Sequence, residues 1–151
     1  MIIRKAVITD LPRLAELFFQ LGYPNTLADL EQRWDEFNSR DADCWVAVDD
    51  GAAIGVVTQN YVLPLNTTAQ YAVISAFVVD EKIRRSGAGT ALIRRAEQEA
   101  VARGCSHTEL SSSMRRPLAH LFYEHYGFAE VPKRYVREYF ARAREDRRTP
   151  E

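Results

Sequence analysis

Residues 78–90 read Val-Val-Asp-Glu-Lys-Ile-Arg-Arg-Ser-Gly-Ala-Gly-Thr, and they lead out of an apolar strand into a long helix. Gly87 and Gly89 carry no Cβ atom, so the backbone can take a positive φ angle here and approach a ligand closely. The first amides of the following helix have no partner within the helix and lie at the positive end of its dipole. Such a turn favours a pyrophosphate, to which Arg84 or Arg85 would add charge. A tight turn that needs small residues is the alternative explanation.

Two common phosphate-binding motifs do not fit this turn. A P-loop needs Lys and then Ser or Thr after its last glycine, whereas Thr90 and Ala91 follow Gly89. A dinucleotide fingerprint needs a small third residue, and Leu92 occupies that position. A nucleotide-binding domain is therefore disfavoured.

The pattern of apolar residues predicts an α/β (mixed α+β) fold around the turn. In chain order we expect a strand at 1–7, helices at 11–21 and 27–39, strands at 44–48, 53–63 and 71–79, a helix at 87–103, a strand at 107–112, a helix at 117–126 and a last strand at 135–140. The three consecutive strands predict antiparallel pairing, and segment 71–112 predicts a right-handed parallel crossover. We expect one mostly antiparallel mixed sheet, in a single domain over 1–141 with a charged tail at 142–151.

Composition limits the classes of partner. The 151 residues hold 20 Lys and Arg against 21 Asp and Glu, so the basic excess of a nucleic-acid-binding protein is missing. No apolar run approaches the ~18 residues of a membrane span, and the start is too weakly apolar for a secretion signal. Cys44 and Cys105 are expected to be small apolar residues in a reducing compartment, since zinc would need a tighter cluster of ligands. We therefore expect a cytoplasmic protein with no nucleic acid, membrane or metal partner.

Two segments resemble signatures of the GNAT N-acetyltransferase superfamily. Residues 84–89, Arg-Arg-Ser-Gly-Ala-Gly, resemble its acetyl-CoA motif, (Arg/Gln)-x-x-Gly-x-(Gly/Ala). Residues 116–128, Arg-Pro-Leu-Ala-His-Leu-Phe-Tyr-Glu-His-Tyr-Gly-Phe, are similar to the family's Ala-x-x-Phe-Tyr-x-x-x-Gly-Phe segment. The expected element order also matches this family from Ile2 to Phe140. The resemblance implies the GNAT fold and acetyl-CoA as cosubstrate.

The resemblance also implies where acetyl-CoA would bind. Its pyrophosphate would rest on the backbone amides of the glycine turn, and its pantetheine arm would pair as an extra strand with residues 77–79, beside a split in the sheet. Those residues are apolar, largely β-branched and free of Pro, which suits strand addition. An ordinary buried strand would have the same side chains. The implied cofactor-binding residues are Phe77, Val78, Val79, Arg84, Arg85, Ser86, Gly87, Ala88, Gly89 and Thr90.

The chemistry of such enzymes is the attack of a neutral amine on a thioester carbonyl. It needs a donor for the developing oxyanion, which the resemblance assigns to a backbone N–H near Val79, and a proton for the departing thiolate. Tyr123 lies at the position that commonly protonates the CoA sulfur in the family, which makes it the candidate catalytic residue. A phenol with a pKa near ~10 suits a thiol near ~8.5. The alternative is a tyrosine whose hydroxyl contacts CoA without transferring a proton.

The chain departs from the family pattern in two places. Many members carry a Glu as general base on the strand before the turn, but residues 71–79 contain no carboxylate, and Val73 and Ser75 stand at the expected places. Arg116 stands where many members have Asn. The base could be a water chain, Glu109 or His107, or the amine could lose its proton before it binds.

In this fold the segment Phe18–Arg40 usually walls the acceptor cleft. It supplies the aromatic residues Phe19, Tyr23, Trp34 and Phe37 and the acids Asp29, Glu31, Asp35 and Glu36. Together these would suit a cationic amine. The alternative is that the aromatic rings are core and the acids face solvent.

The sequence thus indicates an N-acetyltransferase that acts on the primary amine of a small molecule. The alternatives are a protein lysine or N-terminal acetyltransferase, and an acyl-CoA-binding module with weak or no turnover. Because many members of the family form dimers, the resemblance implies a possible homodimer. No particular residue of the sequence indicates it.

Overall fold

The computed structural model describes residues 1–83, 86–111, 117–131 and 134–139. Its residues form two compact units, Met1–Leu110 and Ser111–Glu151, and each is described by itself. The single domain expected over 1–141 stays a prediction. The tail expected at 142–151 lies outside the described residues.

The first unit is built on a five-stranded sheet in the order β1-β2-β3-β4-β5. Neighbouring strands are antiparallel except for β4 and β5, which pair in parallel. The strands are β1 Ile2–Lys5, β2 Ala42–Asp49, β3 Ala52–Val62, β4 Tyr71–Val79 and β5 Thr108–Leu110. The mostly antiparallel mixed sheet with one parallel crossover, predicted from the sequence, is confirmed.

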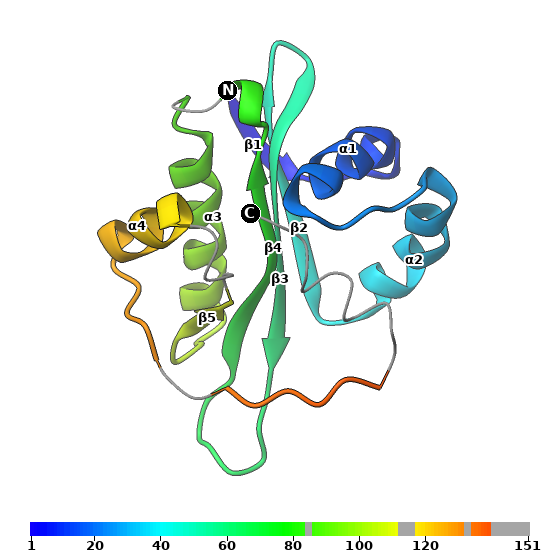
Figure 1. Ribbon diagram of the computed structural model, residues 1–151. Coiled ribbons are helices and arrows are strands. Elements are labelled where there is room, and N and C mark those ends of the chain that lie inside the picture. Colours follow the sequence, from blue (N-terminus) through cyan, green and yellow to red (C-terminus); the bar gives the residue numbers. More distant parts are fainter. Residues whose placement is uncertain (84–85, 112–116, 132–133, 140–151) are drawn as a thin grey trace. The chain divides into compact units, whose positions relative to one another are not determined.

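Helices cover both faces of this sheet. Helices α1 (Leu11–Leu21) and α2 (Leu27–Ser39) lie on one face, and α3 (Ala88–Ala102), which makes the crossover from β4 to β5, lies on the other (Figure 1). Two single turns of 3-10 helix, η1 (Ile8–Asp10) and η2 (Glu81–Ile83), precede α1 and follow β4. Strand β3 is therefore enclosed on both faces, and Val56 and Val57, which point to opposite faces, are both fully buried.

Local sequence explains where the first two helices begin and end. In α1, Leu11, Leu14 and Leu17 are buried on one stripe, and Gly22 ends the helix with a φ of 105°. Helix α2 begins with a capping box, in which Thr26 Oγ1 accepts from the Asp29 amide and the Asp29 carboxylate accepts from the Thr26 amide.

Asp10 occupies the N-cap position of α1, but its side chain makes no capping hydrogen bond to the helix. Its carboxylate accepts instead from the Val7 amide at 2.8 Å and from the Arg4 guanidinium at 2.7 and 2.9 Å. The residue therefore ties the end of β1 to the start of α1.

The second unit contains helix α4 (Pro117–Tyr126), which was predicted. Gly127 ends it with a φ of 119°, and the Gly127 and Phe128 amides donate to the Tyr123 carbonyl at 3.1 and 2.9 Å. The rings of Phe122, Tyr123, Tyr126 and Phe128 contact one another edge to face or stacked. A small aromatic cluster thus holds the helix to the residues that follow it.

The last strand predicted at 135–140 is not found: 134–139 form no strand, and Phe140 lies outside the described residues. Tyr135 and Tyr139 are 87% and 82% exposed, so the alternating apolar pattern that suggested the strand does not bury its apolar side chains. Strand β5 is likewise shorter than predicted, since Ser111 is not in a strand and Ser112 is not among the described residues. No helix in the described segments is long and apolar enough to cross a membrane.

Candidate functional site

A β-bulge interrupts β4 at Ser75. Thr58 of β3 pairs with Ala76 and Gln59 pairs with Ile74, so Ser75 is an extra residue with no opposite partner. On the other edge of β4, pairing with β5 covers 72–74 and ends at Ile74–Leu110. Within the segments that the structure describes, 75–79 are joined to another strand only on the β3 side.

The sheet therefore divides beside the residues expected to pair with pantetheine. Phe77, Val78 and Val79 lie at the C-terminal end of β4, opposite Val57, Val56 and Gly55 of β3. Val78 is buried among core residues, so its side chain packs in the core, and only its backbone would be available to a ligand.

The glycine turn has the geometry that anion binding requires. Gly87 has a φ of 86°, and a Cβ atom added there would meet nothing within 4 Å, so backbone conformation is the reason for glycine. Ser86 Oγ accepts from the Ala88 amide at 3.3 Å, and the Ala91 amide donates to the Gly87 carbonyl at 3.0 Å. The amides of Gly89 and Thr90 lie within the first turn of α3, before that intrahelical bond. Arg84 and Arg85 lie outside the described residues.

Asp80 fixes the start of this turn to α1. It is 4% exposed, and its carboxylate accepts from the Lys82 amide at 3.0 Å, from Arg13 and from Gln20 at 3.3 Å. The Lys82 hydrogen bond, followed by those from Arg13 and Gln20, outweighs burial and lowers the pKa of Asp80 to about 2. Gln20 also accepts from the Glu81 amide at 2.9 Å. The turn is thus held by groups of a helix that precedes it by about 60 residues.

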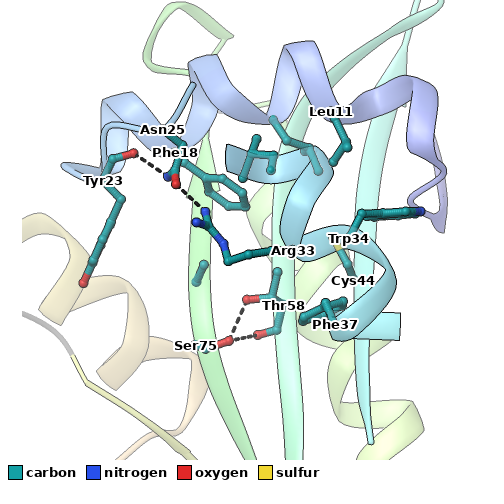
Figure 2. Close-up of a pocket in the computed structure, with 13 residues that line it drawn as sticks. Leu11, Phe18, Tyr23, Asn25, Arg33, Trp34, Phe37, Cys44, Thr58 and Ser75 are labelled. Carbon is teal, nitrogen blue, oxygen red and sulfur yellow. Dashed lines mark hydrogen bonds between the residues drawn. The ribbon is translucent and has the colours of Figure 1, made fainter. Parts of the chain in front are cut away.

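A cavity of about 290 Å³ lies between α1, α2 and the sheet (Figure 2). Its lining is mostly apolar, and it reaches the bulge in β4. The lining residues are Leu11, Leu14, Phe18, Tyr23, Asn25, Leu30, Arg33, Trp34, Phe37, Cys44, Thr58, Ser75 and Ala76. The volume lies near the lower end of the ~300–1,000 Å³ range of small-molecule sites.

The polar groups of the cavity form two pairs. At the bulge, the hydroxyl oxygens of Thr58 and Ser75 lie 2.7 Å apart, and Ser75 also donates to Asn60 Oδ1 at 3.0 Å. On the other side, Arg33 donates to Asn25 Oδ1, and Asn25 donates to the Tyr23 carbonyl at 3.1 Å. Figure 2 shows the Arg33 side chain running from α2 toward Asn25, between Phe18 and the Thr58–Ser75 pair.

Cys44 contributes a thiol to this lining. Burial raises its pKa to about 12, so it stays protonated at neutral pH. It therefore behaves as a small apolar residue, as the sequence suggested.

The acidic wall expected of this cleft is not found. None of the four acids lines the cavity: Asp29 caps α2, Glu36 pairs with Arg40 at 2.5 Å, and Glu31 and Asp35 face solvent. Of the four expected aromatic residues, Tyr23, Trp34 and Phe37 do line it, whereas Phe19 is 69% exposed and does not. Trp34 and Phe37 also pack on the core, so these two rings line the cavity and belong to the core at the same time.

Sequence reasoning missed Arg33 and the Ser75 bulge. A signal for Arg33 was present, because it stands three residues after Leu30 and next to Trp34, within the apolar stripe of α2. The bulge depends on how two strands pair, and nothing in the local sequence marks it.

The two proposed alternative bases lie together at β5: His107 directly precedes the strand and Glu109 belongs to it. His107 Nε2 and Glu109 Oε2 are 2.9 Å apart, and the His107 ring stacks on Tyr71 with centroids 4.8 Å apart. Glu109 pairs with Val73, two residues before the bulge. Neither side chain lines the cavity, and both are about half exposed. Tyr123, the candidate acid, lies on α4 in the second unit, and its catalytic role stays a prediction.

The fold of this chain is similar to that of several solved structures. One is a GNAT family acetyltransferase from Staphylococcus aureus (22% identity, TM-score 0.77, covering 91% of this chain and 98% of that one). An aminoglycoside 6'-N-acetyltransferase from Acinetobacter haemolyticus matches at 23% identity and a TM-score of 0.78, covering 93% and 99%. The glucosamine-6-phosphate N-acetyltransferase of Arabidopsis thaliana matches at 21% and 0.79, covering 92% and 98%. At these identities the likeness shows the fold alone.

The sequence profile of the acetyltransferase (GNAT) family matches residues 8–128. The chain belongs to this family of acetyltransferases, which generally use acetyl-CoA, so the resemblance stated from the two motifs is confirmed. No curated protein matches the chain.

Proposed function

We propose that this protein is an acetyl-CoA-dependent N-acetyltransferase that moves an acetyl group directly from the CoA thioester to the primary amine of a small molecule. One observation carries the proposal: pairing between β4 and β5 ends at Ile74, and the cavity on the α1–α2 face reaches β4 at the next two residues, Ser75 and Ala76. A thioester laid along the end of β4 would meet an amine held in that cavity.

The described residues fit the shape and charge of acetyl-CoA. The left-handed Gly87 and the first amides of α3 suit a pyrophosphate, and the backbone of Phe77–Val79 suits an extended pantetheine arm. Acetyl-CoA, when bound, supplies the thioester carbonyl and the thiolate leaving group. Asp80 has a positioning role, because its bonds to α1 fix the chain just before the turn.

The cavity binds the amine without a general base. Among the lining residues in the described segments there is no carboxylate and no histidine, so the amine reacts after it has lost a proton to water. The hydroxyls of Thr58 and Ser75 orient its N–H groups at the bulge. Its nitrogen bonds to the acyl carbon and releases a proton to water, the C–S bond breaks, and the thiolate takes a proton that we assign to Tyr123, which regains one from solvent.

The test is the release of free thiol from acetyl-CoA with a panel of amines, comparing wild type with Tyr123→Phe. We expect kcat to fall about a hundredfold in the variant, because acid catalysis contributes about 10²–10⁴. Tyr126→Phe, in the same helix and the same aromatic cluster, is the matched control and should keep kcat. Equal rates in both variants would remove Tyr123 from the mechanism but leave the transferase.

An acyl-CoA-binding module with little turnover is the second candidate, and the absence of a carboxylate from the described cavity lining favours it. A melting temperature that rises with acetyl-CoA, together with no thiol release for any amine or lysine-containing peptide, would establish the module. No binding of acetyl-CoA would overturn both candidates.

A further inference from the structure

Arg33 is the cation of the cavity, and one face of α2 places it there. Leu30, Arg33, Trp34 and Phe37 follow the spacing i, i+3, i+4 and i+7, so they share one face of the helix, and all four line the cavity. Three of them are apolar. The fourth brings a guanidinium that is charged at every physiological pH.

The contacts of Arg33 leave this charge unbalanced. Its hydrogen bond goes to the neutral carboxamide of Asn25, and in the described part of the chain it forms no ion pair. Arg40, the residue directly after this helix, by contrast pairs with Glu36, and Arg13 pairs with Glu16 and Asp80. A guanidinium has five N–H donors, so the bond to Asn25 leaves most of them for a ligand.

The chemistry of Arg33 selects the ligand by charge. Its side chain is exposed to solvent and lines the cavity, and a guanidinium binds a carboxylate through two parallel hydrogen bonds. A polyamine or another purely cationic acceptor would be repelled at the same place. A cavity of about 290 Å³ with aromatic sides also requires a compact ligand with an apolar part.

We propose that the acceptor is a small amine that also carries a carboxylate and an apolar substituent, as an apolar α-amino acid does. The inference rests on the proposed function and names its substrate class. The carboxylate binds Arg33, the apolar substituent lies against rings such as Phe18 and Phe37, and the amine faces the hydroxyls of Thr58 and Ser75 (Figure 2). Arg33 is thus the residue that determines specificity.

The test uses L-phenylalanine and phenethylamine, which share the ring and the amine and differ by the carboxylate. Their dissociation constants are measured by calorimetry in the presence of CoA, and kcat/KM is measured with acetyl-CoA. Wild type should bind phenylalanine about ten- to a hundredfold more tightly, as expected for a hydrogen-bonded charge. In Arg33→Gln the preference should vanish, because phenylalanine loses its carboxylate partner and phenethylamine no longer meets a repelling cation. Arg33→Lys, which keeps the charge but loses the planar fork, should retain part of it.

Arg40→Gln is the matched control, because it removes an exposed arginine at the end of the same helix that does not line the cavity, and it should keep the wild-type preference. The melting temperature of each variant shows that it is folded. Equal binding of the two probes to wild type, binding of neither, or a preference that survives Arg33→Gln overturns the inference. In that case, thiol release with another amine would still support the proposed transferase function. Failure to bind acetyl-CoA would instead overturn the proposed transferase function itself.

Discussion

At Gly55 the backbone of β3 packs closely against Leu92 of helix α3, and a side chain there would be tightly placed. A Cβ atom there would lie 3.0 Å from Leu92 Cδ1, 3.2 Å from the Val78 carbonyl oxygen and 3.3 Å from Val79 Cγ2. The same glycine pairs with Val79, the last residue of β4 before Asp80. A single missing methyl group therefore sets how closely α3 approaches the end of β4.

We expect Gly55→Ala to lower the free energy of unfolding by about 1–3 kcal/mol, because the methyl group overpacks the contact with α3. Denaturation by urea measures the change. In a Leu92→Val background, which removes the δ-carbon, the cost of Gly55→Ala should be smaller. The same cost in both backgrounds would show that Leu92 is not its cause.

The candidate site shows what single residues reveal in a sequence. The glycines of the turn could be predicted, since a positive φ favours glycine and Gly87 has one. The charge of the cavity lining could not be predicted from the sequence. Four acids lie close to Arg33 in the sequence, and only the rotation of α2 decides which charged side chain lines the cavity. The rotation follows from burial of Leu30. The side chains of Arg33, Glu31, Asp35 and Glu36 are all exposed, but Arg33 lines the cavity, whereas these three acids do not.

Among the elements, the link between α1 and the end of β4 has a pH dependence. Asp80 has a folded-state pKa of about 2, below its ordinary 3.8, so its contribution to stability is complete above about pH 4. That contribution is lost as the pH falls from about 4 to about 2. Stability falls with falling pH because protonation of the Asp80 carboxylate weakens the hydrogen bonds that it accepts when ionised.

We expect Asp80→Asn to be about 2 kcal/mol less stable than wild type at pH 7. The difference should shrink below pH 4 and be small near pH 2, when urea denaturation is followed across this range. Asp35→Asn, which changes an exposed carboxylate of α2, is the control. A difference that stays constant down to pH 2 would contradict the role given to the ionised carboxylate.

The sequence predicted elements better than their pairing. Four helices and the first five strands appear where apolar spacing placed them, because each has a local signal such as the Thr26–Asp29 capping box or Gly22. The Ser75 bulge and the early end of β5 arise from pairing between strands, which local spacing does not encode. The strand expected at 135–140 was wrong, since alternation alone does not bury Tyr135 or Tyr139.

Across the molecule, the proposed binding functions belong to different parts of the chain. Strand β4, the turn and α3 would hold acetyl-CoA, while α1, α2 and the bulge would hold the amine. This division predicts a pattern of hydrogen exchange. Saturating acetyl-CoA should slow exchange of the amides at 77–79 and 86–90, and raise the free energy of unfolding by about 2.7 kcal/mol at a hundredfold excess over Kd.

Exchange through local opening should not slow along α2, where the amine would bind. ATP is the control ligand, since the turn lacks the features of a P-loop, and it should protect neither segment. Local protection that appears at α4 as well would place Tyr123 in contact with the cosubstrate. No local protection at 86–90 would argue against a site at the glycine turn.

The capping box gives α2 a consequence for the evolution of the enzyme. The helix has its start signal at Thr26, directly before its thirteen residues. Leu30, Arg33, Trp34 and Phe37 line the cavity, and none of them belongs to the glycine turn. We therefore expect its cavity-lining face to vary independently of the glycine turn. Replacing α2 with a helix of the same length and a different inward face would redirect the transferase to another amine and leave the thioester-handling half as it is.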